Sequence, residues 1–322
     1  MAILIVYVDD IILSRDDLEE LVRLKGFLVQ DFEIKDLGQL RYFLGMEVAR
    51  TKKGISISQK KCIVDLLKET CMLGCKPSKT PIEWNDKLRM KTSNPIDRER
   101  YQRLVGKLIY LAHTRLDIAF AVSLVSQYMH DLFQEHLNVV YKILRYLKTT
   151  PRKGIFIGKN EKRDVEAYVD VDWAGSIDDR KSTIGYCTFV WGTITWRSKK
   201  QNVMSRSSTK AEYRAPTQGT CELIRLQRLL EELKIPSEKP IKLFCNNKVG
   251  ISIAYNPVHH DRTKHVEVDK HFIKEKIENG VICMTYVPTT QQIGDILTNR
   301  LSRQSFEDLV DKMGMIDIYS PT

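Results

Sequence analysis

The sequence predicts a mixed α/β fold, because strand-like and helix-like periodicities follow one another along the chain. Residues 165–172 alternate strictly between apolar side chains and polar or acidic ones, which predicts a strand with one acidic face. Four leucines, at positions 223, 226, 230 and 233, predict the buried stripe of a helix over residues 209–233. A chain that carries both patterns combines sheets with helices.

Composition narrows the class of protein. The chain has 322 residues, 43% of them apolar, so it can bury a substantial core, and its length favours two domains over one. The formal charge of +10 would attract either nucleic acid or an anionic membrane. No segment approaches the ~20 apolar residues that span a bilayer, which argues against a membrane function. The seven scattered cysteines predict reduced thiols in an intracellular protein of the nucleus or cytoplasm.

The first 150 residues predict two hairpins and a set of helices. Apolar runs flank Tyr7-Val8-Asp9-Asp10 and place the acidic pair at a hairpin tip. The other elements expected here are a helix over 16–30, a second hairpin with strands at 41–49 and 55–58, a helix over 59–69, a linker over 74–96 and helices within 98–149.

The second half predicts five strands and several helices. Strands are expected at 165–172, 184–191, 193–197, 241–245 and 281–287. Helices are expected at 209–233, 247–254, 266–278 and from 291 onward.

Asp9 and Asp10 are the first candidate site. Adjacent carboxylates repel each other in a tight turn, and paired divalent metal ions are the usual reason to retain them. An ordinary acidic β-turn is the alternative when the four residues are taken alone. The segments farther along the chain favour the metal-binding interpretation.

The chain resembles the C-terminal part of copia-type retrotransposon Pol polyproteins over essentially its whole length. Tyr7-Val8-Asp9-Asp10 looks like the YxDD hairpin of reverse transcriptases, and residues 36–48 with 58–61 are similar to the primer grip and thumb of this family. Thr114-Arg115-Leu116-Asp117-Ile118 resembles the connection segment, although Leu116 and Leu132 stand where the family commonly has Pro. The resemblance implies a truncated reverse-transcriptase palm fragment over 1–80, thumb and connection helices over 81–160, and a ribonuclease H-like domain over 161–322 with a mixed five-stranded sheet and flanking helices.

For the polymerase part, the resemblance implies that Asp9 and Asp10 are catalytic carboxylates. A palm also needs a third carboxylate and fingers that bind the incoming nucleotide. The chain begins six residues before Tyr7. We therefore expect an incomplete polymerase without primer extension of its own, for which an upstream polymerase half would be a partner.

For the ribonuclease part, residues 168–175, 207–213, 244–247 and 293–298 match the family's four metal-site segments in order. The resemblance implies that Asp170, Glu212 and Asp295 are catalytic ligands of two Mg²⁺ ions, and that Asn246 replaces a fourth carboxylate. Hard cations prefer charged oxygen ligands, so Asn246 should weaken metal binding. Pro216 is expected to kink the helix that carries Glu212. We expect impaired hydrolysis of RNA–DNA hybrids.

Each acid also has a local alternative. Glu212 lies three residues after Thr209 and could close a capping box at a helix start. Asp295 could serve the macrodipole of a helix, and Asp172 is interpreted as a turn residue or a neighbour of the ligands.

A basic strip precedes the predicted helix. Trp196, Arg197, Lys199, Lys200 and Arg206 would contact the phosphates of an RNA–DNA hybrid, or of another nucleic acid, without reading sequence. A solvated loop is the alternative. The rival to an impaired enzyme is a non-catalytic nucleic-acid-binding remnant or a pseudogene product without a role.

Overall fold

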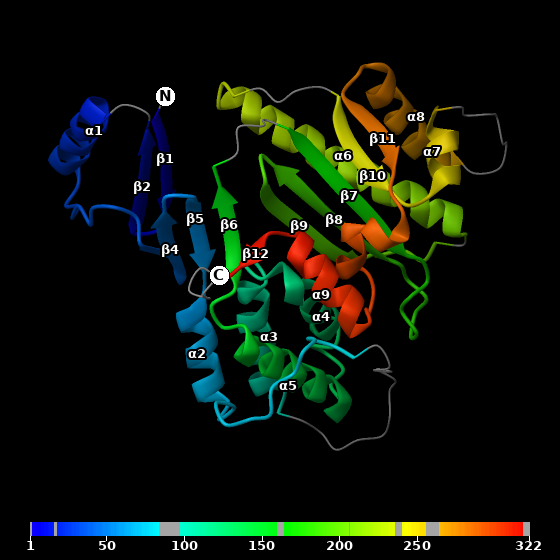
Figure 1. The fold of residues 1–322 in the computed structure, drawn as a ribbon, viewed down its shortest axis with the longest axis horizontal. Coiled ribbons are helices and arrows are strands. Elements are labelled where there is room, and N and C mark those ends of the chain that lie inside the picture. Colours follow the sequence, from blue (N-terminus) through cyan, green and yellow to red (C-terminus); the bar gives the residue numbers. More distant parts are fainter. Residues whose placement is uncertain are drawn as a thin grey trace.

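The computed structural model describes residues 2–15, 18–83, 97–159, 164–205, 207–235, 240–255 and 264–317. Within these ranges the chain forms two five-stranded sheets, a separate two-stranded sheet and helices that cover the larger sheets (Figure 1). The mixed α/β class predicted from the sequence is confirmed.

One five-stranded sheet contains the acidic strand. Its order is β11-β10-β7-β8-β9, with β7 to β9 antiparallel and β10 parallel to both β7 and β11. The sheet is therefore mixed, as expected. Its strands are β7 (Val165–Asp172), β8 (Thr183–Val190), β9 (Thr193–Lys200), β10 (Ile241–Cys245) and β11 (Ile282–Tyr286).

A long helix, α6 (Ser208–Glu232), crosses one face of this sheet. It approaches β7 at Gly219, where an added Cβ would lie 2.4 Å from the Cγ1 of Val169. Two further helices, α7 (Lys248–Tyr255) and α8 (Lys264–Glu278), pack beside α6. The apolar residues of β7 and α6 share one core on this face.

The prediction of a helix that begins at residue 291 is wrong, because the helix begins later in the chain. Two short 3₁₀ turns, η2 (Thr289–Gln291) and η3 (Ile293–Leu297), come first, and the helix α9 spans Arg303–Lys312. The buried Gln292 side chain donates to the carbonyl of Val169 and accepts from the amide of Gly294. Tertiary contact with β7 thus overrides the helical pattern.

The second five-stranded sheet, with the order β12-β6-β5-β4-β3, joins distant parts of the chain. Two of its strands, β6 and β12, were not predicted. They are short and irregular in pattern, and β6 is held by antiparallel pairing to β5. The strands are β3 (Tyr42–Phe43), β4 (Met46–Thr51), β5 (Gly54–Ser58), β6 (Gly154–Gly158) and β12 (Met315–Ile316).

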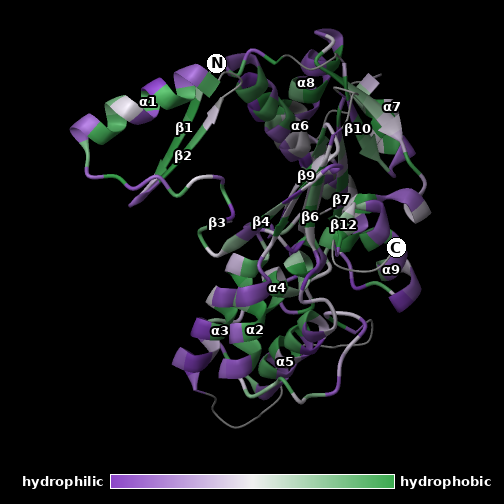
Figure 2. Cartoon of the chain, turned by 60° about the vertical axis from the view of Figure 1, so that its left-hand side comes forward, coloured by the Kyte–Doolittle hydropathy of each residue, from purple (hydrophilic) through white to green (hydrophobic). Residues whose placement is uncertain are grey.

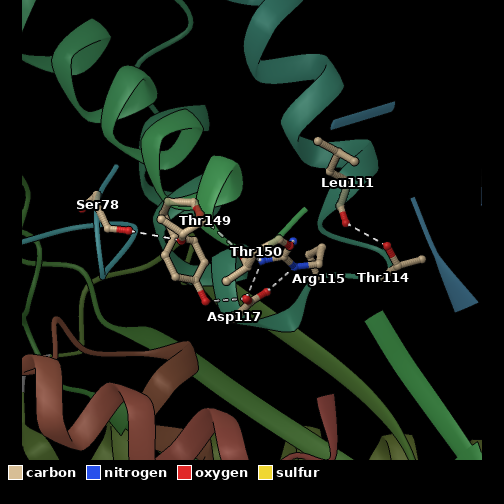
Figure 3. Close-up of polar contacts among 8 residues, drawn as sticks. Ser78, Leu111, Thr114, Arg115, Asp117, Thr149 and Thr150 are labelled. Carbon is tan, nitrogen blue, oxygen red and sulfur yellow. Dashed lines mark hydrogen bonds and ion pairs between the residues drawn. The ribbon is translucent and has the colours of Figure 1, made fainter. Parts of the chain in front are cut away.

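Helices gather below the two sheets in Figure 1. They share one core with the sheet that contains β7, here called the acidic sheet, on the face opposite α6. They are α2 (Lys60–Glu69), α3 (Arg98–Leu111), η1 (Leu116–Ile118), α4 (Ala119–Ser126) and α5 (Gln134–Thr149). A buried ion pair between Arg115 and Asp117 lies where η1 meets the end of α5 (Figure 3). No helix in the described ranges is long and apolar enough to cross a membrane.

The N-terminal hairpin stands apart with the helix α1 (Leu18–Asp31), and its strands are largely hydrophobic (Figure 2). Strand β1 (Ala2–Tyr7) pairs with β2 (Asp10–Arg15), and Tyr7 lies opposite Asp10. Val8, at φ 50°, and Asp9 therefore form the turn. The hairpin with the acidic pair at its tip is as predicted, and Asp9 and Asp10 are exposed.

Candidate metal and nucleic-acid site

The ends of two parallel strands bring Asp170 and Asn246 together. Strands β7 and β10 run side by side with Phe244 opposite Tyr168, so the residues that follow reach the same edge of the sheet. The Nδ2 atom of Asn246 donates to Oδ1 of Asp170 at 3.4 Å. The amide that replaces the expected carboxylate thus contacts a candidate ligand.

Asp170 is buried, with 6% of its surface exposed, and is surrounded by donors. The Thr298 hydroxyl donates to Oδ2, and Asn299 Nδ2 lies 3.4 Å from the same oxygen. Burial raises the pKa of Asp170 to about 6, while the Thr298 hydrogen bond opposes the shift and the charge of Asp295 adds to it. The hydrogen bonds that Asp170 accepts therefore offset only part of the cost of burying its negative charge.

Asp295, in η3, lies next to Asp170. The Asn299 amide that contacts Asp170 also donates to Oδ1 of Asp295. Burial raises the pKa of Asp295 as well, and the Asn299 hydrogen bond lowers it. Asn299 was not among the predicted site residues, because it lies one residue beyond the matched segment 293–298.

Glu212 reaches this edge of the sheet from α6 but has a different partner. Ser207 caps the helix by accepting from the amide of Lys210, so Glu212 lies beyond the third helical position that a capping-box acid occupies. The capping-box alternative is therefore wrong. The Glu212 carboxylate accepts a hydrogen bond from Nδ2 of Asn247, whose Oδ1 accepts from the amide of Gly250 at 2.9 Å.

Amides and a hydroxyl occupy the carboxylate oxygens that a metal centre would use. Asn246 and Asn299 engage Asp170, Asn299 engages Asp295, and Asn247 engages Glu212. Within the described residues, no group of three or more His, Cys, Asp or Glu side chains could hold a metal ion. The oxygen donors are of the kind that magnesium prefers, but this arrangement does not fit a preformed centre for two ions.

Asp172 lies two residues beyond Asp170 and lines a neighbouring cavity of about 230 Å³ with Arg300 and Tyr128. Burial raises the pKa of Asp172 to about 6, and the Arg300 charge opposes that shift.

The predicted basic strip divides between the two faces of β9. Arg197 and Lys199 are exposed on the face that carries α6. Trp196 lies on the opposite face, where its Nε1 donates to the carbonyl of Ala112 at 3.1 Å and its ring packs against the helical core. Lys200 pairs with Asp179 at 2.9 Å, and Arg206 lies outside the described residues.

The fold and this site define a class of protein in which a hairpin with an acidic tip is joined to a mixed five-stranded sheet that carries acidic and amide side chains at one edge. Residues 1–84 match the family model described as reverse transcriptase (RNA-dependent DNA polymerase). The LC11-RNase H1 structure solved with an RNA/DNA hybrid has a TM-score of 0.33 and 14% identity, covering 46% of this chain and 99% of that chain.

Two relatives place the chain more narrowly. The retrovirus-related Pol polyprotein from transposon RE1 of Arabidopsis thaliana is 40% identical over 97% of this chain and 21% of its own length. A putative transposon Ty5-1 protein of Saccharomyces cerevisiae is 32% identical over 68% of this chain and 72% of its own length. The chain belongs to the copia-type retrotransposon Pol family, and it spans about a fifth of the length of the RE1 polyprotein.

Proposed function

We propose that this retrotransposon-derived reverse transcriptase and ribonuclease H fragment binds RNA–DNA hybrids and hydrolyses their RNA strand only weakly. The observation that carries the proposal is the Asn246 amide on Asp170, at the position where the family resemblance implies a fourth carboxylate. In this proposal Asp170, Glu212 and Asp295 bind magnesium with reduced affinity.

The missing charge is large enough to impair such a site. A unit charge at 4 Å contributes roughly 4 kcal/mol at an effective dielectric of 20. If half of that is recovered from solvent and the remaining acids, the loss of about 2 kcal/mol weakens metal binding roughly thirty-fold. The amide hydrogens of Asn246 also point a positive dipole toward Asp170, which disfavours a cation at the same oxygen.

Cleavage of a labelled RNA–DNA hybrid in a magnesium titration tests the proposal. The full chain is compared with Asn246→Asp, and Asp170→Asn serves as the control for contaminating nuclease. We expect Asn246→Asp to cut at least ten-fold faster and to need less magnesium for half of its maximal rate. Equal rates and equal magnesium dependence for the wild-type chain and Asn246→Asp would contradict the proposal.

A second candidate function is nucleic-acid binding without hydrolysis. It is favoured by the hydrogen bonds that occupy Asp170, Glu212 and Asp295 and by the lack of a three-acid group within the described ranges. Hybrid binding by both the wild-type chain and Asn246→Asp, with no cleavage by either, would favour this function over an impaired nuclease.

A further inference from the structure

The cavity of about 230 Å³ that Asp172 and Arg300 line lies on the face of the acidic sheet opposite α6. Asp172 pairs with Thr183 on β8, and Thr183 pairs with Lys200 on β9, so these side chains share one sheet face. Trp196, which alternates onto the same face of β9, packs into the helical core. Helix α4, the loop after β7 and the residues after η3 together enclose the cavity.

Two opposite charges line this cavity without partners from the protein. Asp172 is partly buried at the end of β7, and the Nε atom of Arg300 is buried. Among the residues that the structure describes, no hydrogen bond reaches the Asp172 carboxylate or this Nε atom, and no ion pair joins the two side chains. A buried donor without an acceptor is unfavourable, so a ligand that supplies both donors and acceptors would be stabilised here.

An aromatic wall of the cavity is held in place from outside. The Tyr128 ring stacks on His136 with 3.8 Å between the ring centroids, and its hydroxyl donates to Asp178 at 2.8 Å. Phe120 and Leu124 of α4 add apolar surface to the lining. A flat ligand with polar edges would gain both apolar contact and hydrogen bonds in such a site.

The two charged groups match the edges of guanine better than those of the other bases. Guanine presents N1–H and N2–H side by side, so one carboxylate such as Asp172 can accept from both, while O6 and N7 accept from a guanidinium such as Arg300. Adenine and cytosine each place an acceptor nitrogen beside their amino group, and that nitrogen would face the carboxylate oxygens. Uracil has a single N–H between two carbonyls. A carboxylate and a guanidinium together therefore favour guanine.

The cavity shares a wall with the candidate metal site. Asn299 lines the cavity, and its Nδ2 atom lies 3.4 Å from Oδ2 of Asp170 and donates to Oδ1 of Asp295. Asp172 lies two residues beyond Asp170, on the same face of β7. A nucleotide whose base occupies the cavity would therefore belong to a strand that reaches Asp170.

We propose that this cavity binds the base of an unpaired guanine nucleotide, with Asp172 accepting from N1–H and N2–H and Arg300 donating to O6 or N7. The inference rests on the proposed function in one respect, because it takes the ligand to be part of a nucleic-acid strand. A base reaches such a cavity only when it is unpaired and turned out of its stack. The cavity would thus give the chain a base preference, which phosphate contacts cannot supply.

Binding of mononucleotides tests the cavity independently of cleavage. Saturation-transfer NMR on the full chain in EDTA at pH 7.5 compares the 5′-monophosphates of guanosine, inosine, adenosine and uridine. Inosine lacks the N2 amino group, so one donor to Asp172 is missing. We expect guanosine monophosphate to bind about ten-fold more tightly than the other three. Because only the ligand changes, this comparison does not depend on the folding of a variant.

A pair of variants tests which carboxylate is responsible. Asp172→Asn removes the charge in the cavity, and Asp164→Asn removes an exposed charge just before β7 as the matched control. We expect Asp172→Asn to lose most of the preference for guanosine over inosine monophosphate, and Asp164→Asn to retain it. Equal binding of the four nucleotides by the unmodified chain, or an unchanged preference in Asp172→Asn, would overturn the site.

A second pair of ligands distinguishes a strand from a free nucleotide. Fluorescence anisotropy in EDTA compares an RNA–DNA hybrid that has one unpaired guanosine in its RNA strand with the same hybrid carrying an unpaired uridine. We expect the full chain to bind the guanosine bulge at least about three-fold more tightly. A guanine preference among mononucleotides with equal binding of the two hybrids would overturn the strand as the ligand.

These outcomes separate the guanine site from the proposed function. If the unmodified chain binds and cleaves hybrids but shows no guanine preference, the guanine site is overturned and the proposed function stands. If the chain prefers the guanosine bulge but cleaves no hybrid in magnesium, the guanine site is supported and only the hydrolytic part of the function falls.

Discussion

The guanidinium of Arg115 and the carboxylate of Asp117 form a fully buried ion pair with two parallel hydrogen bonds. The Nε–Oδ1 distance is 2.9 Å, the Nη2–Oδ2 distance is 2.8 Å, and neither side chain is exposed. The Tyr146 hydroxyl donates to Asp117 at 2.6 Å, and Arg115 also donates to the carbonyl of Thr150 at 2.7 Å (Figure 3). The pair thereby fixes η1 against the end of α5, beneath the acidic sheet.

Removing one charge of this pair should strongly destabilise the fold. In Asp117→Asn, the Arg115 guanidinium stays buried without its counter-charge, so we expect the free energy of unfolding to fall by about 3–5 kcal/mol. The exposed pair between Arg303 and Glu307 provides the control. Glu307→Gln should change the free energy of unfolding by less than about 1 kcal/mol. Urea unfolding followed by circular dichroism measures both, and similar losses in the two variants would contradict the expectation.

The same ion pair predicts that the stability of the fold decreases in acidic solution. Burial alone would raise the pKa of Asp117, but the Arg115 charge and the hydrogen bonds from Arg115 and Tyr146 lower it below its usual value. A carboxyl group with a lowered folded-state pKa stabilises the fold above its unfolded pKa, about 3.9, and this stabilisation is lost as the pH falls further. Urea midpoints between pH 3 and 6 should therefore fall more steeply for the wild-type chain than for Asp117→Asn.

Asp170 should have the opposite effect on stability. Its pKa of about 6 lies above the unfolded value, so the folded chain holds the proton more tightly. Its contribution to stability is therefore highest below about pH 4 and is lost as the pH rises to about 6. In EDTA at pH 7.5 we expect Asp170→Asn to stabilise the chain by about 1–3 kcal/mol, with little effect at pH 4. Equal stability of the two chains at pH 7.5 would remove this interpretation.

Sequence periodicity was sufficient for the acidic sheet because each of its strands carries a local pattern. The alternation of β7 and the leucine stripe of α6 both correspond to buried faces. Strands β6 and β12 were missed because they are short and owe their existence to pairing with distant strands. For the site, the sequence identified which segments meet, but the amide contacts of Asn247 and Asn299 depend on side-chain placement that spacing does not encode.

The bend expected at Pro216 stays a prediction. Helix α6 runs as one helix from Ser208 to Glu232 through this proline (Figure 1). Gly219, one turn later, is the point that fixes the helix against β7. Proline at 216 has no amide hydrogen to donate to the carbonyl of Glu212, so this turn of α6 lacks one backbone hydrogen bond.

A methyl group at Gly219 should therefore be destabilising. In Gly219→Ala the new Cβ would lie 2.4 Å from the Cγ1 of Val169, so α6 must move away from β7 at a cost of about 1–3 kcal/mol. Gly106 is the matched control, because it lies in α3 with no atom within 4 Å of an added Cβ. Gly106→Ala should stabilise the chain by about 0.5–1 kcal/mol. Thermal unfolding measures both changes, and stabilisation by Gly219→Ala would contradict the close packing.

The exposed apolar hairpin should promote self-association of the chain. Strands β1 and β2 form a sheet of their own, and Val6 is 60% exposed. Unpaired strand edges with apolar side chains can pair with another copy, and a lysine on such an edge opposes this pairing. We expect the chain to self-associate in sedimentation velocity and Val6→Lys to lower that self-association. Leu73→Lys adds the same charge at another exposed apolar residue, outside any strand, and should have a smaller effect. An equal reduction in both variants would mean that added charge, and not the hairpin edge, controls the association.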